Sequence, residues 1–242
     1  MPQPSIFEKG DSRLLDDKKK AIFHLYVMRL AYLGKRIKPQ VSPAVSYLST
    51  QVTKPTVNDL CKLDRAIRYV RDHIGEGITL TAAGTDKNVL VTGHIDASFG
   101  CHENGKSHTG VCVTIGEGPV FVRSVKQRIV TKSSTEAELV ALSDEAGILF
   151  HIEDFITAQG YVCQIVIGQD NQSTITMITE RKKESMRTRH INVRYFWLRE
   201  RIKEKELTIV YVPTKNMLAD ILTKPMQGNL FKSLVQKLCC YA

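Results

Sequence analysis

The chain has 242 residues, of which 43% are hydrophobic and 24% are charged, and it carries a formal net charge of +9. This composition is typical of a globular protein and excludes a disordered, collagen-like or coiled-coil chain. Because no run approaches about 18 uncharged apolar residues, no transmembrane helix is expected. Residues 1–20 have no apolar core between their charges and do not resemble a secretory signal, so we expect an intracellular protein.

The basic charge is concentrated in one segment. The chain has 34 Lys and Arg against 25 Asp and Glu, a balance that favours a polyanionic partner. Ten basic and three acidic residues between Arg181 and Lys205 give this segment alone a charge of +7. A solvated helix face explains Glu200, Glu204 and their neighbours. The cluster between Arg181 and Arg189 is better explained as a phosphate-binding protrusion.

The first 85 residues predict short helices. Apolar residues recur at helical spacing in 21–33, 45–52 and 57–74. Gly75 and Gly77 end the last of these helices. No catalytic cluster is evident in this part, so residues 1–85 are expected to be a helical appendage to the rest of the chain.

Residues 86–225 predict strands and helices in alternation. Three apolar or β-branched runs come first, followed by a long helix, a strand, two helices, a strand and a final helix. The expected strands are 89–95, 110–116, 120–125, 163–168 and 207–212, and the expected helices are 134–158, 171–179, 187–205 and 217–223. This order predicts an α/β fold with a mixed sheet. Residues 226–242 are expected to form a C-terminal helix or tail.

Four acidic residues stand at the ends of these elements. Asp96 follows the first strand, Glu138 lies one turn into the long helix, Asp170 ends the fourth strand and Asp220 opens the last helix. Open α/β sheets bind ligands beyond their strand ends. Carboxylates brought together there raise one another's pKa unless cations neutralise them. Two Mg²⁺ ions about 4 Å apart would do so and would support phosphodiester cleavage. The alternative is that these acids are helix caps.

Five segments carry a more specific signal. They are, in chain order, HIDASFG, KSSTEAELVALSDEA, IGQDNQSTI, RTRHINVRYFWLRERI and VPTKNMLADILTKP. With these motifs in this order, residues 86–225 resemble the ribonuclease H domain of Ty1/copia-type retrotransposon Pol polyproteins. Residues 17–85 more loosely resemble the connection segment before that domain. Residues 1–85 are therefore expected to be a helical remnant of the reverse transcriptase connection segment.

The resemblance implies an α/β, ribonuclease H-like fold: a five-stranded mixed sheet flanked by helices, with an N-terminal helical appendage. It implies that the catalytic and metal-binding residues are Asp96, Glu138, Asp170 and Asp220. Glu136 competes with Glu138 for the second position. The family's pattern of an acid, an apolar residue, a small residue and Ala falls on Glu138 to Ala141, so we favour Glu138. Glu136 would then be a first-turn acid that favours the positive helix end.

The implied substrate is an RNA/DNA hybrid, which proteins recognise by its shape, phosphates and 2′-hydroxyl groups. The expected nucleic-acid-binding residues are Ser133, Ser134, Thr135, Asn171, Gln172, Arg187, Arg189 and His190. One of the three hydroxyl residues is also expected to cap the long helix. His190 is assigned equally to substrate binding and to helix packing.

The predicted function is Mg²⁺-dependent cleavage of the RNA strand of RNA/DNA hybrids by the C-terminal part of a retrotransposon polyprotein, in a cytoplasmic particle or the nucleus. Mn²⁺ suits the same carboxylates. Many ribonucleases H carry a His on the loop before the last catalytic Asp, but residues 213–219 contain none. The general acid is therefore unassigned, with His94 and His190 as candidates. Two alternatives are a non-catalytic nucleic-acid-binding relic and a subunit that docks through residues 1–85 on a separate reverse transcriptase.

Overall fold

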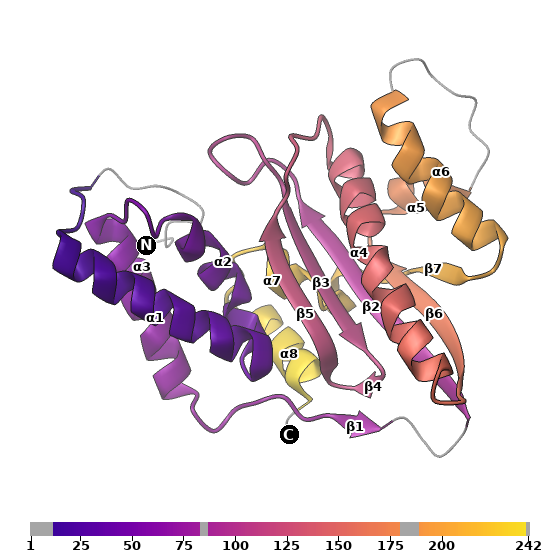
Figure 1. Ribbon diagram of the computed structural model, residues 1–242, viewed down its shortest axis with the longest axis horizontal. Coiled ribbons are helices and arrows are strands. Elements are labelled where there is room, and N and C mark those ends of the chain that lie inside the picture. The colour runs from indigo at the N-terminus through magenta and orange to yellow at the C-terminus, as the bar shows by residue number, and fades with distance from the viewer. Residues whose placement is uncertain (1–11, 83–86, 180–188, 241–242) are drawn as a thin grey trace.

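A five-stranded mixed sheet forms the centre of the molecule (Figure 1). The structure is a computed structural model that describes residues 12–82, 87–179 and 189–240. The strands of the sheet are β2 (Asn88–Ser98), β3 (His108–Thr114), β5 (Pro119–Lys126), β6 (Val162–Gln169) and β7 (Leu207–Tyr211). They lie in the order β5-β3-β2-β6-β7. The pairs β2–β3 and β3–β5 are antiparallel, whereas β6 is parallel to β2 and to β7. The predicted mixed sheet is confirmed.

One face of the sheet is covered by α4 (Ser134–Thr157), with α5 (Gln172–Thr179) and α6 (Arg189–Lys203) beside it (Figure 1). The helix α4 begins at the predicted residue because Ser133 is its N-cap and accepts a hydrogen bond from the backbone N–H of Glu136. The buried core between α4 and the strands includes Val91, Ile95, Val111, Val113, Leu139, Leu142, Leu149, Ile165 and Ile167. This core holds α4 close to the strand that carries Asp96.

The opposite face carries α7 (Asp220–Thr223) and α8 (Gly228–Cys239). Leu222, Leu234 and Leu238 pack there with Cys112 of β3. The predicted helix 217–223 is reduced to a single turn. It ends at Lys224, which has extended backbone (φ −123°, ψ 142°), because the following Pro225 disfavours helical backbone at the residue before it. The helix α8 occupies the segment that was expected to be a helix or tail.

Three N-terminal helices pack beside the edge of the sheet. They are α1 (Asp17–Arg36), α2 (Ser42–Thr50) and α3 (Val57–Asp72), with the 3-10 helix η1 (Pro39–Val41) between the first two. The three predicted helices of this part are confirmed. Their own core includes Phe23, Val27, Leu30, Val45, Leu48 and Leu63. The helix α2 also contacts the edge strand β5, so these helices lie against the sheet. None of the described helices is both long and apolar enough to span a membrane.

A small two-stranded sheet was not predicted. In it, β1 (Thr81–Ala82) pairs with β4 (Gly116–Glu117), which lies in the turn between β3 and β5. Gly118 permits this approach, since its φ is +80° and an added Cβ would lie 2.0 Å from the carbonyl oxygen of Thr79. Strands of two residues are too short to produce a detectable period in the sequence.

We expect Gly110→Ala to destabilise the chain, because Gly110 of β3 lies directly beneath α7. An added Cβ would lie 2.7 Å from Thr223 Cγ2 and 2.9 Å from the carbonyl oxygen of Ala219. Overpacking of this kind costs about 1–3 kcal/mol, which thermal unfolding would detect. Gly147→Ala is the matched control: Gly147 is an exposed residue of α4 with no atom within 4 Å of an added Cβ. That control should gain about 0.5–1 kcal/mol. Equal effects of the two substitutions would contradict this packing of α7.

Candidate active site

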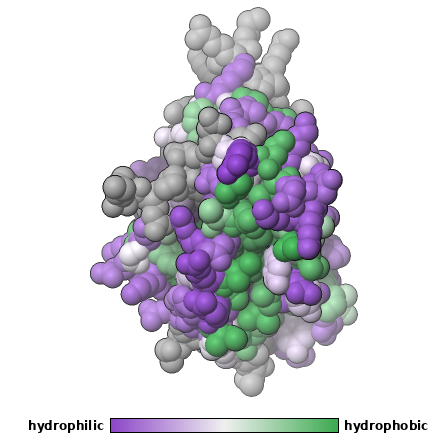
Figure 2. Space-filling view, turned by 90° about the vertical axis from the view of Figure 1, so that its left-hand side faces the viewer, coloured by the Kyte–Doolittle hydropathy of each residue, from purple (hydrophilic) through white to green (hydrophobic). Residues whose placement is uncertain are grey.

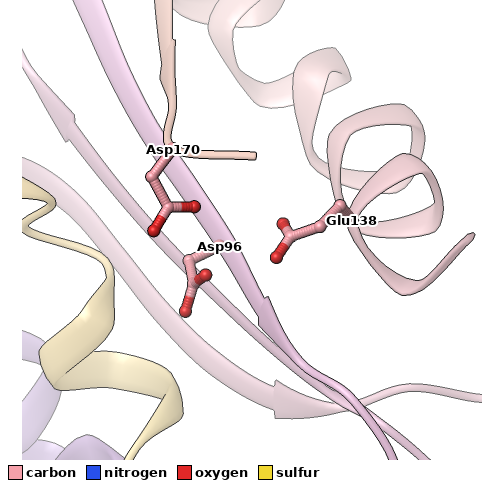
Figure 3. A group of neighbouring side chains, drawn as sticks. All are labelled: Asp96, Glu138 and Asp170. Carbon is pink, nitrogen blue, oxygen red and sulfur yellow. The ribbon is translucent and has the colours of Figure 1, made fainter. Parts of the chain in front are cut away.

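Three carboxylates meet at one edge of the sheet (Figure 3). Asp96 lies near the end of β2, Asp170 directly follows β6, and Glu138 lies one turn into α4. Since β2 and β6 are parallel, their carboxyl ends point to the same edge. One oxygen atom from each carboxylate lies within 4.8 Å of the other two. The structure thus brings together three of the four acids that the sequence predicted.

Asp220, the fourth predicted acid, reaches the same place from α7. Its side chain is buried, and Lys224 Nζ lies 2.6 Å from Asp220 Oδ1 and 3.4 Å from Asp96 Oδ2. One ammonium group therefore connects Asp220 to Asp96. The strand β5 holds α7 in place, because the Ser124 hydroxyl donates a hydrogen bond to the carbonyl of Leu222 at 2.7 Å. We call Asp96, Glu138, Asp170 and Asp220 the acid cluster.

The two glutamates at the start of α4 have different surroundings. Glu136 Oε2 accepts a hydrogen bond from the backbone N–H of Lys132 at 2.7 Å. Glu136 therefore closes the helix start, as expected of a first-turn acid. The Glu138 side chain instead points toward Asp96 and Asp170 (Figure 3). This placement agrees with the choice of Glu138 over Glu136.

Three hydrogen bonds that the sequence did not predict orient the acid cluster. Gln169 Nε2 donates to Glu138 Oε2 at 3.2 Å, Thr214 Oγ1 donates to Asp170 Oδ2 at 3.1 Å, and the Thr223 hydroxyl donates to Asp96 Oδ2. Thr214 belongs to the 3-10 helix η3 (Thr214–Asn216). The sequence offered one signal for such contacts, which is the spacing of the residues that follow Asp220. Thr223 and Lys224 follow Asp220 by three and four residues, the spacing of one helix face.

Burial of several carboxylates together changes their protonation. Burial raises the pKa of Glu138 to about 9, and the charges of Asp96 and Asp170 add to this effect. Burial and then the charge of Asp96 raise the pKa of Asp220 to about 6, although Lys224 opposes the shift. In the metal-free protein Glu138 therefore keeps its proton near pH 7, because burial and the neighbouring carboxylates disfavour its charged form.

The predicted polar nucleic-acid contacts lie at the starts of α4 and α5. Ser133 caps α4, which confirms that one of the three hydroxyl residues is the cap, while Ser134 is exposed and Thr135 is partly exposed. Asn171 is also used structurally, since its side-chain oxygen accepts a hydrogen bond from the first turn of α5. Gln172 is exposed. These residues adjoin the elements that carry two of the four acids.

The predicted basic contacts fall largely outside the described residues. Arg187 lies in the undescribed segment 180–188. Arg189 and His190 belong to the first turn of α6, but their side chains are outside the described part of the chain. His94, the other candidate general acid, is on β2. Burial lowers the pKa of His94 to about 4, so its imidazole is neutral near pH 7 and has no acidic proton to donate.

The strand order, the strand directions and the position of the acids define a ribonuclease H-like domain. Among solved structures, the ribonuclease H1 LC11, isolated from compost, aligns with 57% of this chain and 93% of its own. That alignment has 18% sequence identity and a TM-score of 0.42. No family model matches the chain.

Similar sequences occur in retrotransposons. The chain is 30% identical over 233 residues to the retrovirus-related Pol polyprotein from transposon TNT 1-94 of Nicotiana tabacum. It is 29% identical over 240 residues to that from transposon RE1 of Arabidopsis thaliana. These matches cover 94% and 98% of this chain but only 16% of each polyprotein. The chain is thus homologous to a segment of the Pol polyproteins of Ty1/copia-type retrotransposons, and the resemblance seen in the five motifs is confirmed.

We expect Glu138→Gln to stabilise the metal-free protein more at high pH than at low pH. The folded-state pKa of Glu138 is raised from 4.5 to about 9, so the folded chain holds an extra proton in this window and loses stability as the pH rises through it. Glutamine removes this loss. In EDTA, the midpoint of thermal unfolding should rise by several degrees at pH 8 and by little at pH 5, since about 1 kcal/mol is worth roughly 2–4 °C at this size. Glu136→Gln, which changes the neighbouring glutamate and leaves Glu138 in place, is the control. An equal change at both pH values for Glu138→Gln would contradict the prediction.

Proposed function

We propose that this chain is a Mg²⁺-dependent endonuclease that cleaves the RNA strand of RNA/DNA hybrids. The observation that carries the proposal is the meeting of Asp96, Glu138 and Asp170 from three separate elements within 4.8 Å, with Asp220 beside them. In the proposed reaction a water adds to the scissile phosphate in line with the leaving oxygen. The products are a 3′-hydroxyl and a 5′-phosphate.

The acid cluster fits divalent cations in its chemistry. Its donors are carboxylate oxygens, the hard ligands that Mg²⁺ prefers and that Mn²⁺ also accepts. The raised pKa values of Glu138 and Asp220 agree with a site that lacks positive charge. Asp96, Glu138, Asp170 and Asp220 would hold the ions. Bound ions would supply activation of the attacking water and neutralisation of charge on the phosphate.

The protein's own contribution is to orient the carboxylates before substrate binds. Gln169 presents its amide N–H to Oε2 of Glu138 at 3.2 Å, and this hydrogen bond orients the carboxylate. Thr223 donates to one oxygen of Asp96 in the same way. A carboxylate that is already oriented loses less conformational freedom when a cation binds.

The proposed substrate contacts combine polar groups near the acid cluster with basic residues farther along the chain. Ser133, Ser134, Thr135, Asn171 and Gln172 are proposed to contact the hybrid near the cleaved bond. Arg187, Arg189 and His190 are proposed to contact phosphates, in keeping with the charge of +7 between Arg181 and Lys205.

The matched relatives support a place for this chain within a longer polyprotein. We propose that residues 1–85 are a helical remnant of the reverse transcriptase connection segment. Residues 86–225 then form the ribonuclease H-like domain, and residues 226–242 its C-terminal helix and tail. The reverse transcriptase part of the same polyprotein is the proposed protein partner.

The deciding experiment is cleavage of an end-labelled RNA/DNA hybrid with Mg²⁺, beside double-stranded DNA of the same sequence. We expect cutting of the RNA strand only, abolished by EDTA. Asp96→Asn should lower the rate by about a hundredfold or more, because metal-assisted charge stabilisation is worth several kcal/mol and each 1.4 kcal/mol is tenfold in rate. This variant should still bind the hybrid.

The same experiment decides the non-catalytic alternative. A folded wild-type chain that binds the hybrid but does not cut it, with Mg²⁺ or with Mn²⁺, would overturn the proposed activity. It would favour a nucleic-acid-binding relic, or a domain that acts only when joined to its polymerase.

An apolar surface on α1 favours a second candidate function, docking on a polymerase. One side of α1 is buried through Phe23, Val27 and Leu30. The apolar side chains of its other side are between 40% and 65% exposed, namely Ile22, Leu25, Tyr26, Met28 and Tyr32. Figure 2 shows that hydrophobic residues form a band between hydrophilic ones on the left-hand side of the molecule in Figure 1, where the N-terminal helices lie. Helices with two apolar sides commonly pack against a second partner.

If α1 docks on a polymerase, a polar substitution on its exposed apolar side should weaken that association. We expect Leu25→Gln to weaken association with the reverse transcriptase part, supplied as a separate chain, by about tenfold or more, since burial of a Leu side chain is worth roughly 1.5–3 kcal/mol. Leu90→Gln is the control, because Leu90 is exposed to a similar degree (46% against 49%) but lies on β2. Association can be measured by analytical ultracentrifugation. A wild-type chain that stays monomeric in the mixture would overturn the docking function.

A further inference from the structure

Lys224 lies in the acid cluster, although the reaction proposed above does not use it. Its Nζ is 2.6 Å from Asp220 Oδ1 and 3.4 Å from Asp96 Oδ2. The two carboxylate side chains are only 1–2% exposed, whereas the side chain of Lys224 is 38% exposed. The ammonium group is therefore in contact with two proposed metal ligands, and solvent reaches part of the side chain that carries it.

The local sequence explains how the ammonium group reaches this position. Lys224 follows Asp220 by four residues, a spacing that places two side chains on the same face of a helical turn. The backbone N–H of Lys224 donates to the carbonyl of Asp220 at 3.0 Å and so completes this turn. Pro225 then keeps the backbone of Lys224 extended. The ammonium group is thus carried by a short, well-defined stretch of backbone.

The charges around Lys224 keep it protonated. Burial by itself would lower the pKa of the amine, but the charges of Asp96, Asp220 and Asp170 outweigh burial and raise the pKa above the ordinary range of lysine. In return, Lys224 opposes the rise in the pKa of Asp220. A cation that belongs to the protein therefore offsets part of the charge that divalent ions would neutralise.

We propose that Lys224 is a built-in counter-cation of the acid cluster. It keeps Asp96 and Asp220 together in the metal-free protein, and it competes with divalent cations for these two carboxylates. The proposal deepens the metal-dependent function above and rests on it. Mg²⁺ and Mn²⁺ bind carboxylates through direct oxygen contacts, so an ion that takes Asp220 Oδ1 or Asp96 Oδ2 must displace the ammonium group. An ion that takes the other oxygen of either carboxylate is repelled by the charge of the ammonium group. Lys224 therefore weakens metal binding until additional ligands, such as the phosphate oxygens of a substrate, favour the ion.

Calorimetric titration with Mn²⁺, at one pH and without nucleic acid, tests this competition directly. We expect Lys224→Met to bind Mn²⁺ about tenfold more tightly than the wild-type chain, a change equivalent to 1.4 kcal/mol. Lys224→Arg keeps the positive charge and should bind no more tightly than the wild type. Lys203→Met removes an exposed charge at the end of α6 and is the matched control, with unchanged affinity.

A second readout uses the wild-type chain and does not depend on the folding of any methionine variant. The lysines are ¹³C-dimethylated, and the signal of Lys224 is assigned by its absence in Lys224→Arg. We expect this signal to shift during titration with Mg²⁺, with the same saturation as the backbone amide signals of Asp96 and Asp170. Such a shift would show that the ion moves the ammonium group.

The outcomes separate this proposal from the proposed function. Equal Mn²⁺ affinity of the wild type and Lys224→Met, or a Lys224 signal that stays constant while the amide signals saturate, would overturn the competition alone. If the wild type and Lys224→Met are both folded and neither chain binds Mn²⁺ or Mg²⁺, the metal-dependent function is overturned together with the competition. Wild-type binding that is lost in Asp96→Asn, together with tighter binding by Lys224→Met, would support both.

Discussion

Burial of several carboxylates in one place is the constraint on which the acid cluster depends. Four acids from four different elements lie at one edge of the sheet, where burial disfavours their charged forms. Hydrogen-bond donors and one ammonium group offset part of that cost. The remaining deficit of positive charge makes divalent cations the natural complement of the site. Stability and the proposed chemistry therefore depend on the same residues.

The short helix α7 links this site to the back of the sheet. It packs on Gly110 of β3 and is hydrogen-bonded by Ser124 of β5. The Ser124 hydroxyl accepts in turn from His108, which is hydrogen-bonded to His102. Burial lowers the pKa of His108 to about 3 and that of His102 to about 4, so both rings are neutral near pH 7. The position of Asp220 thus rests on contacts far from it in sequence.

Local patterns were sufficient for most elements and for the candidate acids. The helix that begins at Ser134 was predicted at its first residue because capping is a local interaction. The choice of Glu138 over Glu136 came from the pattern of the family that the motifs resemble, and it stays a prediction. The strands of the sheet were found from apolar runs, and the resemblance of the motifs implied a five-stranded mixed sheet. The spatial order of the strands was not predicted. The directions in which side chains point could not be predicted from such local patterns. Gln169 and Thr214 contact acids for reasons that no local period records.

The sequence by itself determined the succession of helices and strands, the four acids at their ends and the relationship to Pol polyproteins, because periodicity, capping and motif order all act over short stretches of chain. Only the tertiary structure decided that Lys224 lies between Asp96 and Asp220, that β1 pairs with β4, and that α1 keeps one apolar side exposed. Each of these features depends on contacts between segments that are distant in the chain, or on the surface that neighbouring elements leave exposed. The packing of the whole chain determines these contacts and this surface.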